Sequence, residues 1–586
     1  MLRRQRCAWP CSSVWWAMRV FMAWALAAYV SQPPAAAQRA GSGPPPTRLV
    51  VDAHAPIEAV GPVSPRLVGI NFPVHPRAEV VARAGLTQKG TNGVWEALRP
   101  LNLGFVRQWL SAPECNLHGL DLPTPQPTQE GAWETWLREQ LAPHSHLWDG
   151  FDGYMRRVAG LGDDVRIMLC LSTFPIWLGP FRWHEEPFGD LVDLRSERRA
   201  PYEAFLTWAG IDKNHIGDVA RFTRFRARVA TYVELLAAHC MADPILRKAV
   251  RYIELGNEPD NGGEIVQNDV RWRMFVYGPD SAPRRKSGEK ALPGDEGLLQ
   301  QVYLSAYAGL RAADPEHRIA MGGPGAAWAH NQRRTQGDFY YLNYFIDGAA
   351  GIQGVGRDRI EHLTYHNYQH TYDHGRAVTD LAKAFGKPVF LTEYNASAGA
   401  HGMNFMQTGA TTVANALAQL AQTGNAAGAA FFKAAGGGFG MLLGREGKLW
   451  RTGAYWALRL FSEHMVGGRP LRWRVEAADE GAVNCLFVAP RGRQHSYAAM
   501  LVNLSDDTRA VTLQLDGLAG EPAQGRFIEL PLAGSRNDYR DVPVENLKTR
   551  SVMPCAEPGI VLRPRAVVFL TWARRVDSLR TGGSLD

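Results

Sequence analysis

Cysteine is scarce in this chain, with seven residues among 586, and no two of them have the Cys-x-x-Cys spacing. Two lie near the N-terminus, and the other five are scattered: Cys115, Cys170, Cys240, Cys485 and Cys555. An odd, dispersed set of this kind predicts neither a disulfide framework nor a zinc site with cysteine ligands. Cys170 lies within an apolar segment, so we expect it to be a core residue.

Long apolar runs are also missing beyond the N-terminus. The run at 20–30 has 11 residues, whereas a helix that spans a bilayer needs about 20. This run follows Arg3, Arg4 and Arg6 and precedes three alanines at 35–37, which is the pattern of a secretory signal peptide. We therefore expect residues 1–37 to be a signal peptide. The mature protein is then secreted or periplasmic, without stable insertion into a membrane.

Two further features are absent. The net charge of +7 falls to +3 without the four arginines of residues 1–37 (7 − 4). No basic stripe with interleaved aromatic residues is present, so nucleic acid is not an expected partner. A Gly-rich phosphate loop is also missing after the first expected strand, where the chain reads Gly69-Ile70-Asn71-Phe72-Pro73. That absence weighs against a doubly wound dinucleotide-binding sheet.

What the chain does have is a repeated alternation of short apolar runs, loops and amphipathic helices. This pattern predicts βαβ units and a parallel sheet, and eight such units indicate an α/β fold of the (β/α)8 TIM-barrel type. The expected helices include 222–239, 298–312 and 411–421. The expected strands are 67–71, 105–108, 165–171, 250–255, 318–322, 360–365, 389–392 and 427–433.

The pattern changes near residue 469. From there on, short alternating strands separated by turns predict a C-terminal β-sandwich domain, and an early strand at 48–52 is expected to join it. The predicted organisation is a signal peptide at 1–37, a linker and N-terminal strand at 38–60, the barrel at 61–466, the sandwich at 467–575 and a frayed tail at 576–586.

Two glutamates each lie at the end of an expected barrel strand, Glu258 before Pro259 and Glu393 after Thr392. Catalytic side chains of such barrels lie at the carboxyl ends of the strands. A retaining glycosidase needs one carboxyl group that donates a proton and one carboxylate that attacks the anomeric carbon. Asn257 offers an amide donor that suits a sugar hydroxyl. Arg107, His366 and Tyr368, at other strand ends, could keep Glu393 ionised and aimed.

These residues resemble glycoside hydrolase clan A. The resemblance covers the expected barrel: Arg107 after strand two, Pro175-Ile176-Trp177 after strand three, Asn257-Glu258-Pro259 after strand four, His366-x-Tyr368 after strand six and Thr392-Glu393 after strand seven. Within the clan, the chain is most similar to families 39, 51 and 79. The resemblance implies a retaining (β/α)8-barrel hydrolase with Glu258 as acid/base and Glu393 as nucleophile. Trp177 is either a sugar-stacking residue or core packing.

The chain departs from the clan at the end of strand eight. Many members carry a Trp there, whereas this chain reads Phe431-Phe432-Lys433. Lys433 could meet a substrate carboxylate, which would favour an acidic, uronate-containing glycan. The histidines at 362, 366, 370 and 374 recur every four residues, but along a strand they are too far apart to share one ion at about 3.3 Å per residue. We therefore expect neither a metal nor a cofactor.

The predicted function is a secreted retaining glycoside hydrolase that cleaves a poly- or oligosaccharide through a covalent glycosyl-enzyme. Two alternatives stay open. One is a glycan-binding barrel without catalysis, and the other is a transglycosylase that processes an exopolysaccharide. The sugar, the linkage and the choice between exo and endo cleavage depend on loops that the sequence does not define.

Overall fold

The computed structural model describes the greater part of the chain after residue 46. The described residues are 47–72, 92–110, 115, 117, 120, 122–123, 126–172, 174–180, 205–212, 215–259, 297–327, 339–349, 352–368, 373–395, 407–435, 439–445, 448–476, 481–490, 496–516, 525–530, 548–552 and 560–573. The expected signal peptide, the C-terminal tail, His370 and Cys555 lie outside these residues.

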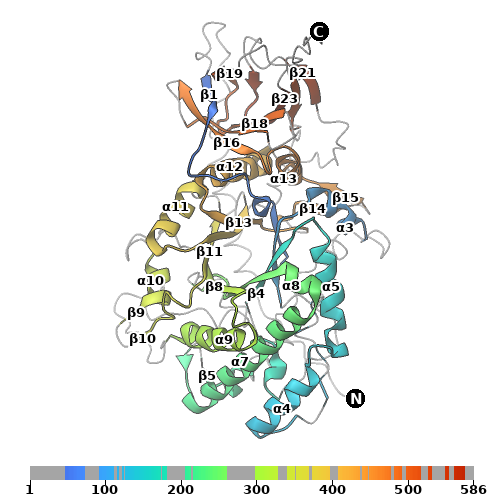
Figure 1. The fold of residues 1–586 in the computed structure, drawn as a ribbon, viewed down its shortest axis with the longest axis vertical. Helices are drawn as coiled ribbons and strands as arrows, with labels where there is room; N and C mark the ends of the chain where they lie inside the picture. Colours follow the sequence, from blue (N-terminus) through green and yellow to red (C-terminus); the bar gives the residue numbers. More distant parts are fainter. Residues whose placement is uncertain are drawn as a thin grey trace, which may run out of the picture. The chain divides into compact units, whose positions relative to one another are not determined.

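Eight parallel strands close into a barrel in chain order, which confirms the predicted fold class (Figure 1). The last strand closes the barrel on the first through Phe431 and Ile70. Each of the eight expected segments overlaps one of these strands. They are β2 (Gly69–Phe72), β3 (Phe105–Trp109), β4 (Arg166–Leu171), β7 (Val250–Leu255), β8 (Ala320–Ala326), β11 (His362–Tyr368), β12 (Val389–Asn395) and β13 (Ala426–Phe431).

Helices surround the barrel strands (Figure 1). Several begin at a polar residue that caps the free backbone N–H groups of the first turn: Asp218, Asp373 and Thr452 each accept a hydrogen bond from the backbone N–H three residues later. The helices are α3 (Asn92–Leu98), α4 (Glu130–Gln140), α5 (Asp149–Ala159), α7 (Val219–Ala242), α8 (Pro244–Ala249), α9 (Leu298–Ala313), α10 (Tyr340–Asp347), α11 (His374–Phe385), α12 (Gln407–Thr423) and α13 (Gly453–His464).

The barrel interior changes from apolar to charged along the strand direction. Alternate residues of a strand point to the same face, so the inward positions of β3 are Phe105 and then Arg107. The apolar layer contains Phe105, Met168, Phe390 and Ala430, and the rings of Phe105 and Phe390 stack at 5.3 Å. Two residues further along β3, Arg107 is completely buried. The polar groups of the barrel therefore gather at the carboxyl ends of the strands, where catalysis was expected.

The second sheet has nine strands in the order β21-β20-β23-β18-β17-β16-β1-β19-β22. Side chains from both halves of this series share one hydrophobic core, which includes Leu49, Phe487, Leu513 and Leu570. That sharing agrees with the expected two-layer β-domain. Its strands are β1 (Thr47–Pro56), β16 (Arg469–Glu476), β17 (Val483–Ala489), β18 (Ser496–Asn503), β19 (Arg509–Asp516), β20 (Gly525–Glu529), β21 (Lys548–Val552), β22 (Ile560–Leu562) and β23 (Val567–Ala573).

The N-terminal strand β1 lies inside this sheet. It pairs antiparallel with β16 and parallel with β19. Helix α12 of the barrel contacts the same sheet, since Gln422 Nε2 donates to the carbonyl oxygen of Cys485 at 3.0 Å. No helix within the described ranges is both long and apolar enough to cross a membrane.

Candidate active site

Arg107 is the centre of the polar network at the carboxyl ends of the strands. Its guanidinium group donates through Nε to Glu254 and through Nη1 to Glu393 Oε1, the latter at 2.6 Å. Nη2 donates to Asn257 Oδ1 at 2.7 Å and to the Cys170 thiol at 3.3 Å. The side chain has no exposed surface. These partners therefore take the place of the water that the cation loses on burial.

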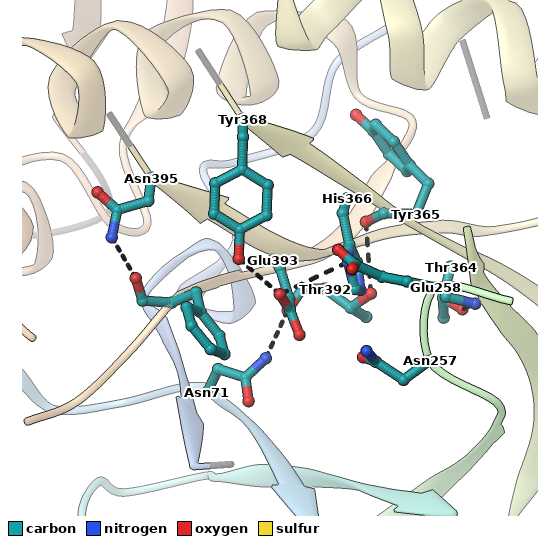
Figure 2. A network of polar contacts seen from close by, with 12 residues as sticks. Asn71, Asn257, Glu258, Thr364, Tyr365, His366, Tyr368, Thr392, Glu393 and Asn395 are labelled. Carbon is teal, nitrogen blue, oxygen red and sulfur yellow. Dashed lines mark hydrogen bonds and ion pairs between the residues drawn. The ribbon is translucent and has the colours of Figure 1, made fainter. Parts of the chain in front are cut away.

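Glu393 lies on β12 and is held at both carboxylate oxygens. Arg107 binds Oε1, and the hydroxyl of Tyr368 donates to Oε2 at 2.6 Å (Figure 2). His366 Nδ1 lies 3.5 Å from the same Oε2. Since Tyr368 and His366 occupy alternate positions of β11, both can reach the barrel interior. The carboxylate is thus fixed in orientation by donors from two strands, β3 and β11.

Glu258 is positioned by the loop that leaves β7. Gly256 and Glu258 both have left-handed backbone angles, with φ of 95° and 48°, and the Glu258 N–H donates to the Gly325 carbonyl at 2.8 Å. A left-handed conformation is uncommon for a residue with a Cβ and marks a site where the surroundings determine the backbone. This turn directs the Glu258 carboxyl to His366 Nδ1, at 2.8 Å (Figure 2).

The two carboxyl groups lie close together. One oxygen of Glu258, one oxygen of Glu393 and one ring nitrogen of His366 are all within 4.8 Å of one another. The environments of the two groups differ, however. The Glu258 side chain keeps 22% of its surface exposed, whereas Glu393 keeps 4%. One carboxyl group can therefore exchange protons with solvent, and the other is enclosed by hydrogen-bond donors.

The electrostatics of the site follow from burial and close charges. Burial raises the pKa of Glu393 above its ordinary value, although His366 and Arg107 act in the opposite direction. Burial by itself lowers the pKa of His366, but Glu393 and Glu258 outweigh it and raise that pKa. An elevated pKa gives a carboxylate that is more basic than usual, and the adjacent cations favour its ionised form.

Comparison with solved structures finds the same architecture in glycosidases. A family GH51 α-L-arabinofuranosidase from Thermotoga petrophila is 14% identical, with a TM-score of 0.51, and the match covers 90% of this chain and 99% of that one. A glucosidase from Croceicoccus marinus is 12% identical, with a TM-score of 0.51 and coverage of 91% and 100%. BuGH86 in complex with neoagarooctaose is 11% identical, with a TM-score of 0.54 and coverage of 90% and 79%.

The chain has the fold of these glycosidases. The fold implied by the resemblance to clan A is thereby confirmed. Neither a protein-family model nor a curated protein matches the chain. At identities of 11–14%, the likeness establishes the fold, and the chemistry of this glycosidase-like barrel depends on its own side chains.

The structure brings five of the expected supporting and catalytic residues into direct contact with one another or with a shared partner. Arg107, Asn257, Glu258, His366 and Tyr368 all lie in the network around Glu393. Asn257 accepts from Arg107 through Oδ1. The role of its Nδ2 as a donor to a substrate hydroxyl stays a prediction.

Trp177 does not have the position that sugar stacking requires. Only 2% of its surface is exposed, its indole N–H donates to the Leu117 carbonyl at 2.7 Å, and its ring packs edge-on against Tyr232 of α7 at 5.6 Å. A ring buried on both faces has no surface to offer a sugar. The core-packing alternative is therefore the one that agrees with the structure, and the stacking role is corrected.

Lys433 follows β13 and is half-buried. Its backbone N–H donates to Phe439 O at 3.1 Å, and its carbonyl accepts from Met441 N at 3.0 Å. The preceding Phe432 is also half-buried, and its ring lies edge-on to Tyr368 at 6.3 Å. Phe432 thus lies beside a residue that binds Glu393. The role of Lys433 towards an acidic sugar stays a prediction.

The histidine series divides between different elements, as expected for a segment that is not one helix. His362 and His366 are on β11, whereas His374 begins α11. Burial lowers the pKa of His362 and of His374 to about 4, so both are neutral core groups at pH 7.

Three polar residues of this region were not selected from the sequence as site residues. Asn71 Nδ2 donates to the Thr392 carbonyl at 2.9 Å, and Asn395 Nδ2 donates to the Phe432 carbonyl (Figure 2). Glu254, two residues before the turn at Gly256, binds Arg107. The two-residue period of β7, which places Tyr252 and Glu254 on one face, is the signal that could have identified Glu254 as an inward residue.

Proposed function

We propose that this chain is a retaining glycoside hydrolase in which Glu258 is the acid/base and Glu393 the nucleophile. The observation that carries the proposal is the pair of carboxyl groups whose oxygens approach within 4.8 Å. Carboxyl groups of retaining enzymes are about 5–5.5 Å apart, whereas inverting enzymes leave about 6.5–9.5 Å for a water molecule. The short separation favours direct attack by one carboxylate.

The environments support this division of roles. Glu393 is enclosed, and its two oxygens are aligned by Arg107 and Tyr368. A nucleophile needs that alignment, because attack demands a fixed approach to the anomeric carbon. Glu258 is partly exposed and contacts His366. An acid/base must lose a proton and regain it in each turnover, which access to solvent allows.

The reaction then proceeds in two displacements. Glu258 donates its proton to the glycosidic oxygen while Glu393 attacks the anomeric carbon, the C–O bond to the leaving group breaks, and a glycosyl ester forms on Glu393. Glu258, now a carboxylate, takes a proton from water, and the hydroxide equivalent displaces Glu393 from the sugar. His366 Nδ1 lies 2.8 Å from Glu258 and orients its carboxyl throughout.

The decisive experiment is trapping with a panel of 2-fluoro aryl glycosides, followed by mass mapping of the labelled peptide. The sugar that labels the protein identifies the substrate class, and the labelled residue identifies the nucleophile. We expect the label on Glu393 and no label in Glu393→Gln. A label on another carboxylate would refute the assignment, and a product of inverted anomeric configuration in the NMR spectrum would refute retention.

We also propose that the mature enzyme acts outside the cytoplasm, on the basis of the signal-peptide pattern at residues 1–37. The test is N-terminal sequencing of the protein recovered from the periplasm or the medium. We expect a mature N-terminus close to residue 38. A full-length protein confined to the cytoplasm would contradict this expectation.

A further inference from the structure

The site contains a third carboxylate that the two-step reaction does not use. Glu254 lies on β7 with its side chain inside the barrel, has no exposed surface and binds Nε of Arg107. Arg107 Nη1 binds the proposed nucleophile Glu393. One guanidinium group therefore joins two carboxylates that lie on different strands.

The charge balance explains why a carboxylate is needed at this position. An isolated cation in a protein interior is strongly unfavourable unless it is paired and hydrogen-bonded. With Glu254 ionised, Arg107 is already neutralised by a partner that takes no part in bond making. Although burial alone would raise the pKa of Glu254, Arg107 and His366 outweigh burial and hold that pKa below its ordinary value.

Gly325, with φ of 64°, packs closely against the Glu254–Arg107 pair. A Cβ at this position would be 3.1 Å from Glu254 Oε1 and 3.5 Å from Arg107 Nη2. The Gly325 carbonyl also accepts the hydrogen bond from the Glu258 backbone. The segment that positions the acid/base therefore also lies beside the Glu254–Arg107 pair, at a position where a larger residue would meet both side chains.

We propose that Glu254 is a positioning residue that neutralises Arg107 and thereby keeps Glu393 basic enough to act as the nucleophile. In the described structure Glu393 faces Arg107 from β3, His366 and Tyr368 from β11, and Glu258 from the loop after β7. The thiol of Cys170 on β4 accepts from Arg107 Nη2. Glu254 is the anion that offsets the attraction of Arg107 for the Glu393 charge.

The sign of the effect follows directly. In Glu254→Gln the negative charge is lost, Arg107 attracts the Glu393 carboxylate more strongly, and the ionised form of Glu393 is favoured. With an effective dielectric constant of about 20 and a separation of roughly 6 Å across one guanidinium, the titration midpoint of Glu393 should fall by about one to two pH units. A less basic nucleophile attacks more slowly.

The test is 13C NMR of protein labelled at the glutamate side-chain carboxyl carbon. The Glu393 signal is the one lost in Glu393→Gln, and its titration midpoint is compared between the unmodified protein and Glu254→Gln. We expect the midpoint to move to lower pH. Arg107→Lys keeps the cation and replaces only the planar group. The titration midpoint of Glu393 should therefore change less in Arg107→Lys than in Glu254→Gln. An unchanged Glu393 midpoint in folded Glu254→Gln overturns the proposal.

A second variant covers the case in which Glu254→Gln does not fold. Glu254→Asp keeps the charge and removes one glutamate signal, so the signal lost relative to the unmodified protein belongs to Glu254. We expect that signal to remain at the carboxylate position at every pH at which Glu393 titrates. A protonated Glu254 in this range would overturn the proposal.

The matched control is Glu529→Gln in the second sheet, where Glu529 accepts a hydrogen bond from Arg563 at 2.6 Å and is largely buried. It should lower stability without moving the Glu393 signal. A kinetic measurement complements the NMR and rests on the proposed function. The acid limb of the kcat/KM profile should move to lower pH in Glu254→Gln and not in Glu529→Gln. If no glycoside is hydrolysed, the proposed function fails while the NMR result still decides the role of Glu254.

Discussion

The Tyr368 hydroxyl provides the most direct test of how Glu393 is kept ionised. Tyr368→Phe removes one oxygen, the donor to Glu393 Oε2 at 2.6 Å, and retains the ring that lies edge-on to Phe432. A hydrogen bond to a charged group contributes roughly 1.5–3 kcal/mol. Because this bond favours the ionised form of Glu393, its loss should move the acid limb of the pH profile to higher pH.

The size of the effect depends on pH. About 1.36 kcal/mol corresponds to a factor of ten, so kcat/KM well down the acid limb should fall about 10- to 150-fold. On the plateau Glu393 is ionised in both enzymes, and its charge is being lost as the new bond forms. The reduction there should therefore be much smaller. The assay is kcat/KM from pH 3.5 to 8 with the aryl glycoside whose 2-fluoro analogue labels the enzyme.

Tyr365→Phe is the matched control. Tyr365 is on the same strand and also donates through its hydroxyl, but to the His374 carbonyl at 3.4 Å; its side chain is fully buried, whereas that of Tyr368 is half-buried. Its loss should leave the acid limb in place. A uniform reduction across the pH range in Tyr368→Phe, or an equal limb shift in Tyr365→Phe, would refute the role given to this hydroxyl.

Three further variants test the electrostatics, the substrate and the core. Glu393→Gln should raise Tm at pH 7, because the pKa of Glu393 is raised in the folded state. The contribution of Glu393 to stability is therefore fully present below its unfolded-state pKa near 4.5. It is lost as pH rises through the folded-state pKa. The gain in Tm should disappear near pH 4, and calorimetry at both pH values decides it. Lys433→Ala should reduce hydrolysis of uronate-containing glycosides more than of neutral ones, and equal losses on the two would exclude the acidic-substrate role. Trp177→Ala should destabilise the fold by about 3–5 kcal/mol, as expected for a large buried side chain. An unchanged KM in the folded fraction would show that Trp177 serves packing and not sugar binding. A large increase in KM without loss of Tm would contradict the packing role.

The barrel strands could be predicted because each is a short apolar run with turn residues at its ends. Strand β7 begins and ends where the pattern placed it, at Val250 and Leu255. Strand β8 differs, since it runs to Ala326 through Gly322, Gly323 and Pro324. Gly and Pro normally end a strand, so the strand predicted from the sequence ended at residue 322. Tertiary pairing with β7 and β11 maintains the extended backbone despite that local composition.

The proximity of the two glutamates could be predicted for a similar reason. Glu258 and Glu393 follow recognisable strand ends, and parallel strands of one barrel bring such ends together. What the sequence could not supply is the direction of a side chain. Trp177 follows a strand in the same way, yet it turns into the core against Tyr232. Glu254 sits within an apolar run, where an isolated acid gives no sign of its partner 147 positions away.

The position of β1 has a consequence for how the chain matures. This strand, residues 47–56, lies between β16 and β19, so both of its edges are completed by segments more than 400 positions later. During synthesis β1 is made before the barrel, and its two partners are made after it. Until then β1 presents two unpaired edges, which are prone to association with other chains. We therefore expect β1 to be a site of mispairing during synthesis, until the segments that complete its two edges have been made.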